Sequence, residues 1–426
     1  MLSRFDCVKS SMPADAPARP AAADAEPAAS ARGDAAPRLS KRAREVPESA
    51  IRRFFEIAAD MDEVISLGIG EPDFTSPEPV LEAGRQALAN GQTSYTANAG
   101  REDLRHSIAS DLSERHGVRY DAENEVLVTV GVSEAMQCTM LALLDSGDEI
   151  LIPEPCFVSY GPLAELAGAD VTYVPTSAEH DFEVRPEAIA ERITPQTKAL
   201  FLSYPSNPTG AVLRRETLEE IAKLVIENDL LVISDEIYDR LIYGRAHENG
   251  HVSVPSAPGL KERTVLLGGF SKNYAMTGWR IGYACAPEPM YSGMYKAHQY
   301  IVMSAPTMAQ IGAVAALEES QDAVEEMRRA YDVRRRLIVD GLREAGLPTF
   351  EPEGAFYCFP DIRPTGLSSE AFAQRLLKEE RVACVPGDAF GPSGEGFLRC
   401  SYATSREEIE EALRRISRFV ERVGRS

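Results

Sequence analysis

Short apolar stretches alternate with segments of helical periodicity through the middle of this sequence. Six stretches are apolar enough to form buried strands, namely residues 126–130, 149–152, 198–202, 230–234, 265–267 and 281–284. Residues 131–144 and 216–227 have the spacing of amphipathic helices. Strands separated by helices predict an α/β fold, in which a largely parallel sheet is covered on both faces and ligands bind at the carboxyl ends of the strands.

The pattern changes at both ends of the chain. After about residue 318, a long charged helix over 318–345, a few short strands and a terminal helix from Arg406 predict a smaller α+β unit. Residues 13–38 hold 12 Ala and 5 Pro but no Leu, Ile, Val or Phe, so they have nothing to bury. We therefore expect a disordered tail over residues 1–44, and a helix that begins near Ile51. An N-terminal segment (45–78) then packs with a small domain (319–426), and a large domain spans 79–318.

Composition narrows the class of protein. The chain has 426 residues, of which 44 % are hydrophobic, and it contains no apolar run long enough to span a bilayer. Lys and Arg total 45 against 66 Asp and Glu, which gives a formal charge of −21 and disfavours a nucleic-acid partner. Seven cysteines without C-x-x-C spacing predict neither a metal site nor a disulfide framework, as in a cytoplasmic protein.

The basic residues are 37 Arg and only 8 Lys. Together with the excess of acid, this predicts a protein adapted to high salt, and the alternative is the codon bias of a GC-rich genome. We expect a halophilic protein that gains stability as salt screens its surface charges.

Two charged residues follow apolar strands. An acid such as Asp235 directly after residues 230–234 is costly to bury unless a cation pairs with it, and the alternative is a helix N-cap. Lys272 follows a strand and two glycines, so it lies at the same sheet edge as Asp235, where an amine can form an imine with an aldehyde. Ser271 and Arg280 are then placed to hold a phosphate. Taken alone, Lys272 and Arg280 are more typical of a protein surface.

Two further turns point to the same edge of the sheet. Residues 203–210 form a turn in which Asn207 aims its amide into the crevice, although Asn-Pro and Thr-Gly are common turn formers. The junction from Gly131 through Val132 to Ser133 starts a helix, whose free N–H groups favour an anion.

Taken together, these segments resemble the class I aminotransferases, which are fold type I enzymes dependent on pyridoxal phosphate. The resemblance runs from about Val46 to the C-terminus. It rests on the segments 67–74, 95–100, 207–210, 234–238, 270–280 and 398–402. Residues 354–360, 385–387 and 390–391 look most like the archaeal aromatic and aspartate aminotransferases. The resemblance implies a mostly parallel seven-stranded sheet between helices, a smaller α+β domain, and an aminotransferase that acts as a homodimer.

The resemblance also implies the roles of individual residues. Lys272 holds pyridoxal 5'-phosphate as an internal aldimine and shuttles the Cα proton, and Asp235 keeps the pyridine nitrogen protonated. Arg399 binds the substrate carboxylate with the help of the Gly70 backbone. The remaining residues contact the cofactor: Asn207 and Tyr238 at the phenolic oxygen, Phe157 on the ring, Gly131, Val132, Ser133, Ser271 and Arg280 at the phosphate, and Tyr95 at the phosphate of the other subunit.

Some positions depart from better-known relatives. Leu141 stands where some aspartate-specific enzymes have a lysine for the side-chain carboxylate, and Asn273 stands where Thr or Ser is frequent. Phe356, Tyr357 and Phe359 are candidates either for a pocket wall or for core packing. We therefore expect aromatic amino acids to be preferred over aspartate, with 2-oxoglutarate as the acceptor.

Three other classes of protein are alternatives. A carbon–sulfur lyase on the same scaffold uses the same lysine and phosphate cup, and it differs by forming pyruvate and ammonia. A regulatory relative lacks the lysine or carries a helix-turn-helix, whereas Lys272 is present here. A nicotinamide enzyme is disfavoured because no G-x-G-x-x-G follows a strand.

Overall fold

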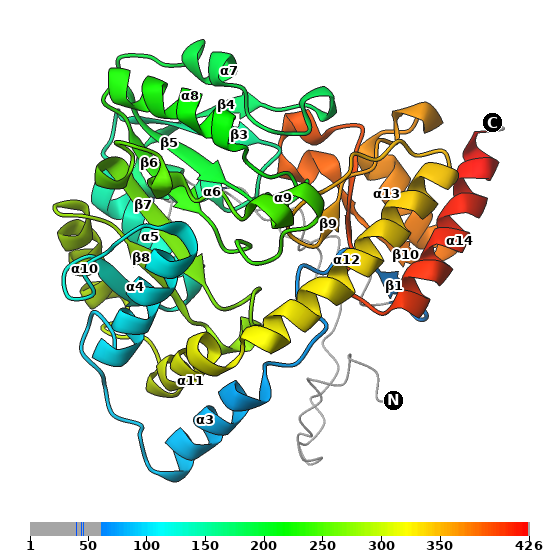
Figure 1. Cartoon of the computed structure of the whole chain (residues 1–426). Coiled ribbons are helices and arrows are strands. Elements are labelled where there is room, and N and C mark those ends of the chain that lie inside the picture. The colour runs from blue at the N-terminus through cyan, green and yellow to red at the C-terminus, as the bar shows by residue number, and fades with distance from the viewer. Residues whose placement is uncertain (1–39, 41–43, 45, 47–60, 425–426) are drawn as a thin grey trace, which may run out of the picture. The chain divides into compact units, whose positions relative to one another are not determined.

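The structure is a computed structural model that describes residues 40, 44, 46 and 61–424 (Figure 1). Apart from Ser40 and Arg44, the predicted disordered tail lies outside the described residues, and so does the helix expected near Ile51. In the described part of the chain, no helix is both long and apolar enough to cross a membrane.

A seven-stranded sheet forms the centre of the larger part of the molecule, as the resemblance implied. Its strands, in spatial order, are β2 (Val126–Thr129), β8 (Gly282–Cys285), β7 (Thr264–Gly269), β6 (Leu231–Asp235), β5 (Thr197–Ser203), β3 (Glu149–Glu154) and β4 (Asp170–Pro175). Only β8 runs antiparallel to its neighbours. The carboxyl ends of the other strands therefore meet at one edge, which is where ligands bind in such sheets.

Six of these strands were predicted from their apolar sequence, and β4 was not. Its residues are mostly exposed or half-buried, because β4 lies at the edge of the sheet and pairs only with β3. An edge strand needs no continuous apolar run, so the pattern that indicated the central strands is absent from it.

Helices cover both faces of the sheet (Figure 1). On β3, Ile150 and Ile152 pack with one set of helices, and Leu151 between them packs with another. The first set consists of α5 (Gly131–Leu143), α6 (Tyr160–Ala167) and α10 (Met290–Ile301); the second consists of α7 (Pro186–Ala190) and α8 (Arg215–Glu227). Near β2 the sheet packs with α4 (Glu102–His116) and α11 (Thr307–Glu319). Alternate strand residues thus enter different cores, and each large aliphatic side chain contributes roughly 1.5–3 kcal/mol by its burial.

The C-terminal part contains two small sheets. One is antiparallel in the order β11 (Val385–Pro386), β12 (Leu398–Ser401) and β9 (Tyr357–Cys358). The other joins β1 (Ile65–Ser66) to β10 (Val382–Ala383) in parallel, so the segment before the large sheet contacts the C-terminal part. The helices here are α12 (Gln321–Glu344), α13 (Ser369–Glu380) and α14 (Arg406–Val423). The boundaries of the predicted domains remain a prediction.

The single charged helix expected over 318–345 is wrong at its start. The chain forms α11 and α12 instead, with Ser320 between them at φ −118° and ψ 17°. The Ser320 hydroxyl donates to the Ala315 carbonyl at 3.2 Å, a local bond that competes with helix continuation. The described residues also form α3 (Glu78–Ala89), α9 (Gly244–Asn249) and short 3-10 turns at Ala178–His180, Val254–Ser256, Lys261–Arg263, Thr277–Trp279, Arg363–Thr365, Gly387–Phe390 and Pro392–Gly394.

Candidate active site

A cavity of about 340 Å³ lies at the carboxyl edge of the large sheet. Eleven of the thirteen predicted site residues line it: Gly70, Val132, Ser133, Phe157, Asn207, Asp235, Tyr238, Ser271, Lys272, Arg280 and Arg399. They come from segments up to 329 residues apart in the chain, from Gly70 to Arg399. The topology brings them together because β5, β6 and β7 end side by side and β12 of the small sheet faces those ends.

Lys272 follows β7 and turns its amine into the cavity. Its Nζ donates to the Gly70 carbonyl at 2.6 Å and lies 5.8 Å from the centre of the Phe356 ring. Burial lowers the pKa of this amine from 10.5 to about 8, an effect that Glu71 opposes and Arg399 reinforces. A neutral amine, which is the nucleophilic form, is therefore accessible near neutral pH.

Asp235 ends β6 and is 3 % exposed. Its Oδ2 accepts from the Tyr160 hydroxyl at 2.8 Å, and its Oδ1 accepts from the Ile237 amide at 3.2 Å. Burial raises the pKa of Asp235 to about 6, although both hydrogen bonds oppose the shift. No helix begins at this point among the described residues, since the next helix is α9. The helix-cap alternative is therefore excluded.

Arg399 lies on β12 and is 3 % exposed. Its Nη1 donates to Asn207 Oδ1 at 3.0 Å, and its Nη2 donates to the Gly68 carbonyl at 2.6 Å. Its guanidinium also stacks over the Tyr357 ring, 4.6 Å from the ring centre. The Arg399 Nε is buried and has no partner among the described residues. This arginine has unused donor capacity inside the cavity, as a carboxylate site requires.

One end of the cavity is built for an anion. The helix α5 begins at Gly131, where φ is +71°, and no side chain caps its first turn, so the amides of Val132 and Ser133 are available. The Arg280 backbone has a φ of +53°, and its side chain lies against this turn. A Cβ added at Gly131 would lie only 2.6 Å from Arg280 Nη2. Ser271 lines the same cavity. Gly131 itself does not line the cavity; because it has no side chain, it leaves space for the Arg280 guanidinium.

Aromatic side chains form the remaining walls. The Tyr238 and Tyr357 hydroxyls lie 3.0 Å apart, and a Cβ on Gly70 would lie 2.5 Å from the Tyr357 hydroxyl. The ring of Phe157 meets that of Tyr160 edge-on, with centres 5.6 Å apart. The Gly70 backbone therefore approaches the tyrosine closely, which only a residue without a side chain allows.

Several expected residues lie elsewhere. Tyr95 is 82 % exposed and does not line the cavity of its own chain. Leu141 on α5 is also outside the lining and is 45 % exposed. Of the three aromatic candidates, Phe356 and Phe359 are core residues, and only Tyr357 lines the cavity.

Sequence reasoning missed four lining residues, namely Met136, Tyr160, Ile237 and Thr277. Tyr160 is the most informative, because its hydroxyl bonds both Asp235 and the Ser203 hydroxyl, each at 2.8 Å. Tyr160 lies three residues after Phe157, at the end of the turn that leads into α6, and this proximity in the sequence was the available signal.

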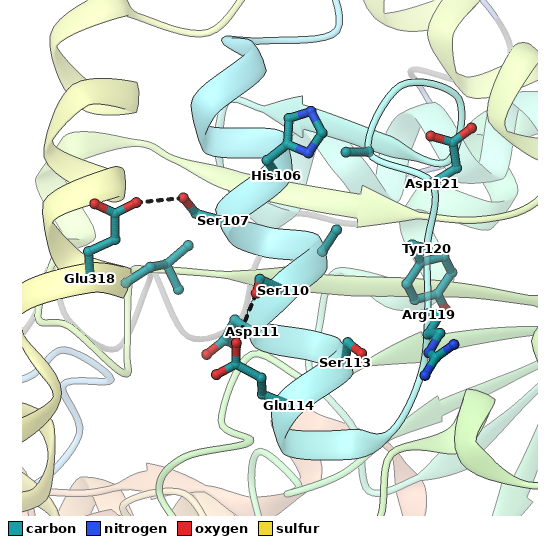
Figure 2. A pocket seen from close by; sticks show the side chains of 13 residues that line it. His106, Ser107, Ser110, Asp111, Ser113, Glu114, Arg119, Tyr120, Asp121 and Glu318 are labelled. Atoms are coloured by element: carbon teal, nitrogen blue, oxygen red, sulfur yellow. Dashed lines mark hydrogen bonds between the residues drawn. The ribbon is translucent and has the colours of Figure 1, made fainter.

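A larger hollow of about 880 Å³ lies along the exposed side of α4 (Figure 2). Figure 2 shows Ser110 bonded to Glu114, and Ser107 bonded to Glu318 of α11, both at 2.9 Å. This hollow is an open surface groove that contains none of the predicted site residues. The convergent charges make the smaller cavity the candidate functional site.

Comparison with known proteins agrees with this geometry. Residues 62–416 match the family Aminotransferase class I and II. An aspartate aminotransferase of Pyrococcus abyssi is 46 % identical, covering 90 % of this chain and 98 % of that protein. Aromatic-amino-acid aminotransferase 2 of Thermococcus litoralis is 43 % identical, with the same coverage. The crystal structure of an aromatic aminotransferase from Pyrococcus horikoshii OT3 superposes with a TM-score of 0.83 at 46 % identity, covering 88 % of this chain and 99 % of that one.

The chain belongs to the class I and II aminotransferase family and is a pyridoxal-phosphate-dependent transaminase. Its cavity fits the cofactor, because it offers an amine for the aldehyde, a buried acid for the pyridine nitrogen, and a helix N-terminus with an arginine for the phosphate. Nothing in these comparisons favours the carbon–sulfur lyase.

Proposed function

We propose that this enzyme transfers the amino group of an aromatic L-amino acid to 2-oxoglutarate, with Lys272 as the residue that holds the cofactor and moves the proton. The observation that carries the proposal is that the Lys272 amine, the Asp235 carboxylate and the Arg399 guanidinium line one cavity. Bound pyridoxal phosphate supplies an electron sink for the carbanion that forms at the substrate Cα.

The protein's own residues orient that cofactor. Asp235 would hold the pyridine nitrogen and stabilise the proton on it, and the Tyr160 hydroxyl fixes this carboxylate. Asn207 and Tyr238 would donate to the phenolic oxygen, and Phe157 would pack on the ring. The first turn of α5, Ser271 and Arg280 would hold the phosphate.

Lys272 moves a proton at the substrate Cα. Burial lowers the pKa of this amine, which favours the neutral form that is able to accept that proton. The Gly70 carbonyl, 2.6 Å from Nζ, orients the amine inside the cavity. Gly70 also meets the substrate carboxylate through its backbone.

Arg399 binds the substrate α-carboxylate through its guanidinium fork. Asn207 and the Gly68 carbonyl each hold one of its terminal nitrogens, which fixes the plane of the fork before substrate arrives. Because every amino acid carries this carboxylate, Arg399 does not discriminate between side chains.

Discrimination comes from the rest of the cavity. Its apolar and aromatic lining includes Met136, Phe157, Ile237 and Tyr357. Among the described residues that line it, the cations are Lys272, Arg280 and Arg399, and each already has a role. A side-chain carboxylate would therefore be buried without a partner, whereas an aromatic ring would not.

A half-reaction screen tests the proposal. The purified cofactor-loaded enzyme is mixed with phenylalanine, tyrosine, aspartate or alanine, the change in cofactor absorbance is followed, and kcat/KM is measured with 2-oxoglutarate. We expect kcat/KM for the aromatic amino acids to exceed kcat/KM for aspartate by at least about tenfold, which is the effect of burying one unpaired charged group.

Lys272→Ala should remove the borohydride-reducible cofactor link and nearly all turnover. Full activity of that variant contradicts the catalytic assignment, and an aspartate preference above tenfold contradicts only the substrate assignment.

We also propose that the active enzyme is a cytoplasmic homodimer adapted to high salt. The exposed Tyr95 supports the dimer, since a tyrosine that reaches the phosphate of the other subunit must leave its own chain. The six cysteines among the described residues are buried and free, which is consistent with a reducing compartment. The formal charge of −21 supports salt adaptation.

A further inference from the structure

Asn273, the residue after Lys272, points away from the cavity into a buried polar network. Its side-chain nitrogen donates to Asp239 Oδ1 at 2.6 Å, and the two residues are 3 % and 6 % exposed. Neither residue lines the cavity. The bond therefore joins the loop of the catalytic lysine to a group that touches neither substrate nor cofactor.

Asp239 is a permanent buried anion. Arg115 and His116, both at the end of α4, contact its Oδ2; the His116 Nε2 lies at 3.4 Å. Burial opposes the charge, but Arg115 and His116 hold the pKa of Asp239 well below its usual value. The carboxylate thus stays charged and fixed across the working pH range.

The network continues to the surface through α4. Asp111 accepts from Arg115 Nε at 3.1 Å and also contacts Arg240, the residue after Asp239. Asp111 lines the open groove in Figure 2, so the helix that carries the anchor reaches from the buried network to solvent. A helix of 15 residues that is held at several points is a rigid support for the residues bonded to it.

Asp239 is also attached to the other catalytic group. Its amide donates to the Glu236 carbonyl at 3.0 Å, inside the turn that follows Asp235. The neighbouring Glu236 side chain is fixed by His251 at 2.8 Å and by the Val254 amide at 2.9 Å. Asp239 therefore contacts the turn that carries Asp235 through its backbone amide, and the loop that carries Lys272 through its carboxylate.

The network has a thermodynamic cost. Among the described residues, the Asn273 Oδ1 and the His116 Nδ1 are buried without a hydrogen-bond partner. Each such atom costs about 1–3 kcal/mol. The amide at position 273 is explained by the bond that its nitrogen makes.

We propose that Asn273 and Asp239 are positioning residues that set the placement of the Lys272 amine relative to Asp235. This inference rests on the roles proposed above for Lys272 and Asp235. With this hydrogen bond in place, the loop of Lys272 keeps the amine buried and within reach of the substrate Cα. Without this hydrogen bond, the loop moves. The Lys272 amine then becomes more hydrated and is no longer held in position relative to the substrate Cα.

The test begins with Asn273→Ala. We expect kcat to fall about five- to tenfold while KM stays within about twofold, because the amine is misplaced but the Arg399 site is intact. In the apoenzyme, the pH of half-maximal acetylation of Lys272, followed by mass spectrometry, should rise by about 0.5–1 because the amine becomes better hydrated. The matched control is Asp332→Asn. This substitution also changes one polar partnership of a carboxylate, an ion pair with Arg335 on α12. It should leave both values unchanged.

A pair of exchanged residues gives the second arm. Asn273→Asp places two carboxylates together and should be worse than Asn273→Ala, whereas adding Asp239→Asn restores a donor–acceptor pair and should recover at least about half of that loss. If Asn273→Ala lowers only the melting temperature, or if Asp239→Asn does not improve Asn273→Asp, the positioning role is wrong. A normal Asn273→Ala beside an inactive Lys272→Ala overturns this inference and leaves the proposed function intact. If Asn273→Asp does not fold, the kinetics and labelling of Asn273→Ala decide the question.

Discussion

Lys272 and Asp235 are both buried, and burial moves their pKa values in opposite directions. Each shift brings the group closer to its neutral form near pH 7, which is what a cavity without cofactor favours. Burying these two groups therefore lowers the stability of the apoenzyme, as is common for groups at functional sites.

The cost of Lys272 can be measured. The pKa of the amine is about 8 in the folded chain and 10.5 ordinarily, so the folded state binds fewer protons between these values and stability rises as the pH increases through them. Below pH 8 the buried charge costs roughly 3 kcal/mol. We expect the apoenzyme of Lys272→Met to be more stable than the wild-type apoenzyme by about 2 kcal/mol at pH 7, and this difference to shrink by pH 10.

Urea denaturation of both apoenzymes at pH 7 and pH 10 checks this prediction. Lys223→Met, at an exposed position of α8, is the matched control and should change stability by less than about 0.5 kcal/mol at either pH. A Lys272→Met apoenzyme that is less stable than wild type at pH 7 would mean that the amine is not desolvated.

The candidate site residues at strand ends were predictable from the sequence, whereas the residues that hydrogen-bond to them or to their loops were not. Asp235 and Lys272 follow recognisable apolar strands, so parallel topology alone brings them to one edge. The Asn273–Asp239 bond and the Tyr160–Asp235 bond join residues 34 and 75 positions apart. No periodicity marks such pairs, because they depend on how turns of irregular backbone fold back on one another.

At the scale of single elements, the start of α5 shows how a helix end becomes a binding site. Its first turn has no side-chain cap, and Gly131 leaves room for Arg280 against that turn. The sequence indicated this junction through its strand, glycine and helix order. It did not indicate β4 or the break at Ser320, because an exposed edge strand and a single serine leave weak patterns.

We predict that Gly131→Ala weakens the binding of pyridoxal phosphate by at least about tenfold, because the new methyl group displaces a charged donor from the phosphate site. The control is Gly117→Ala at the end of α4, where φ is +68° and the added carbon would meet nothing within 4 Å. Both substitutions carry the strain of a positive φ, about 1 kcal/mol, but only one disturbs Arg280. Equal cofactor affinities in the two variants, measured by fluorescence titration, would contradict the role of this turn.

For the whole molecule, the net charge of −21 predicts self-repulsion at low ionic strength. Added salt screens this repulsion, with a Debye length that falls from about 10 Å at 0.1 M to about 3 Å at 1 M. We expect the melting temperature and the activity to rise with KCl into the molar range. A melting temperature that is equal in dilute buffer and in concentrated KCl would leave the arginine bias to codon usage.

The exposed Tyr95 has a consequence for mixtures of defective chains. If the tyrosine of each chain completes the site of its partner, a Lys272→Ala chain still donates an intact tyrosine, and a Tyr95→Ala chain still carries an intact lysine. A hybrid of the two then contains one complete site and one site with both defects. Refolding the two variants together should give more activity than the sum of the separately refolded samples, so that one chain complements the other. Strictly additive activity would mean that each site is built within a single chain.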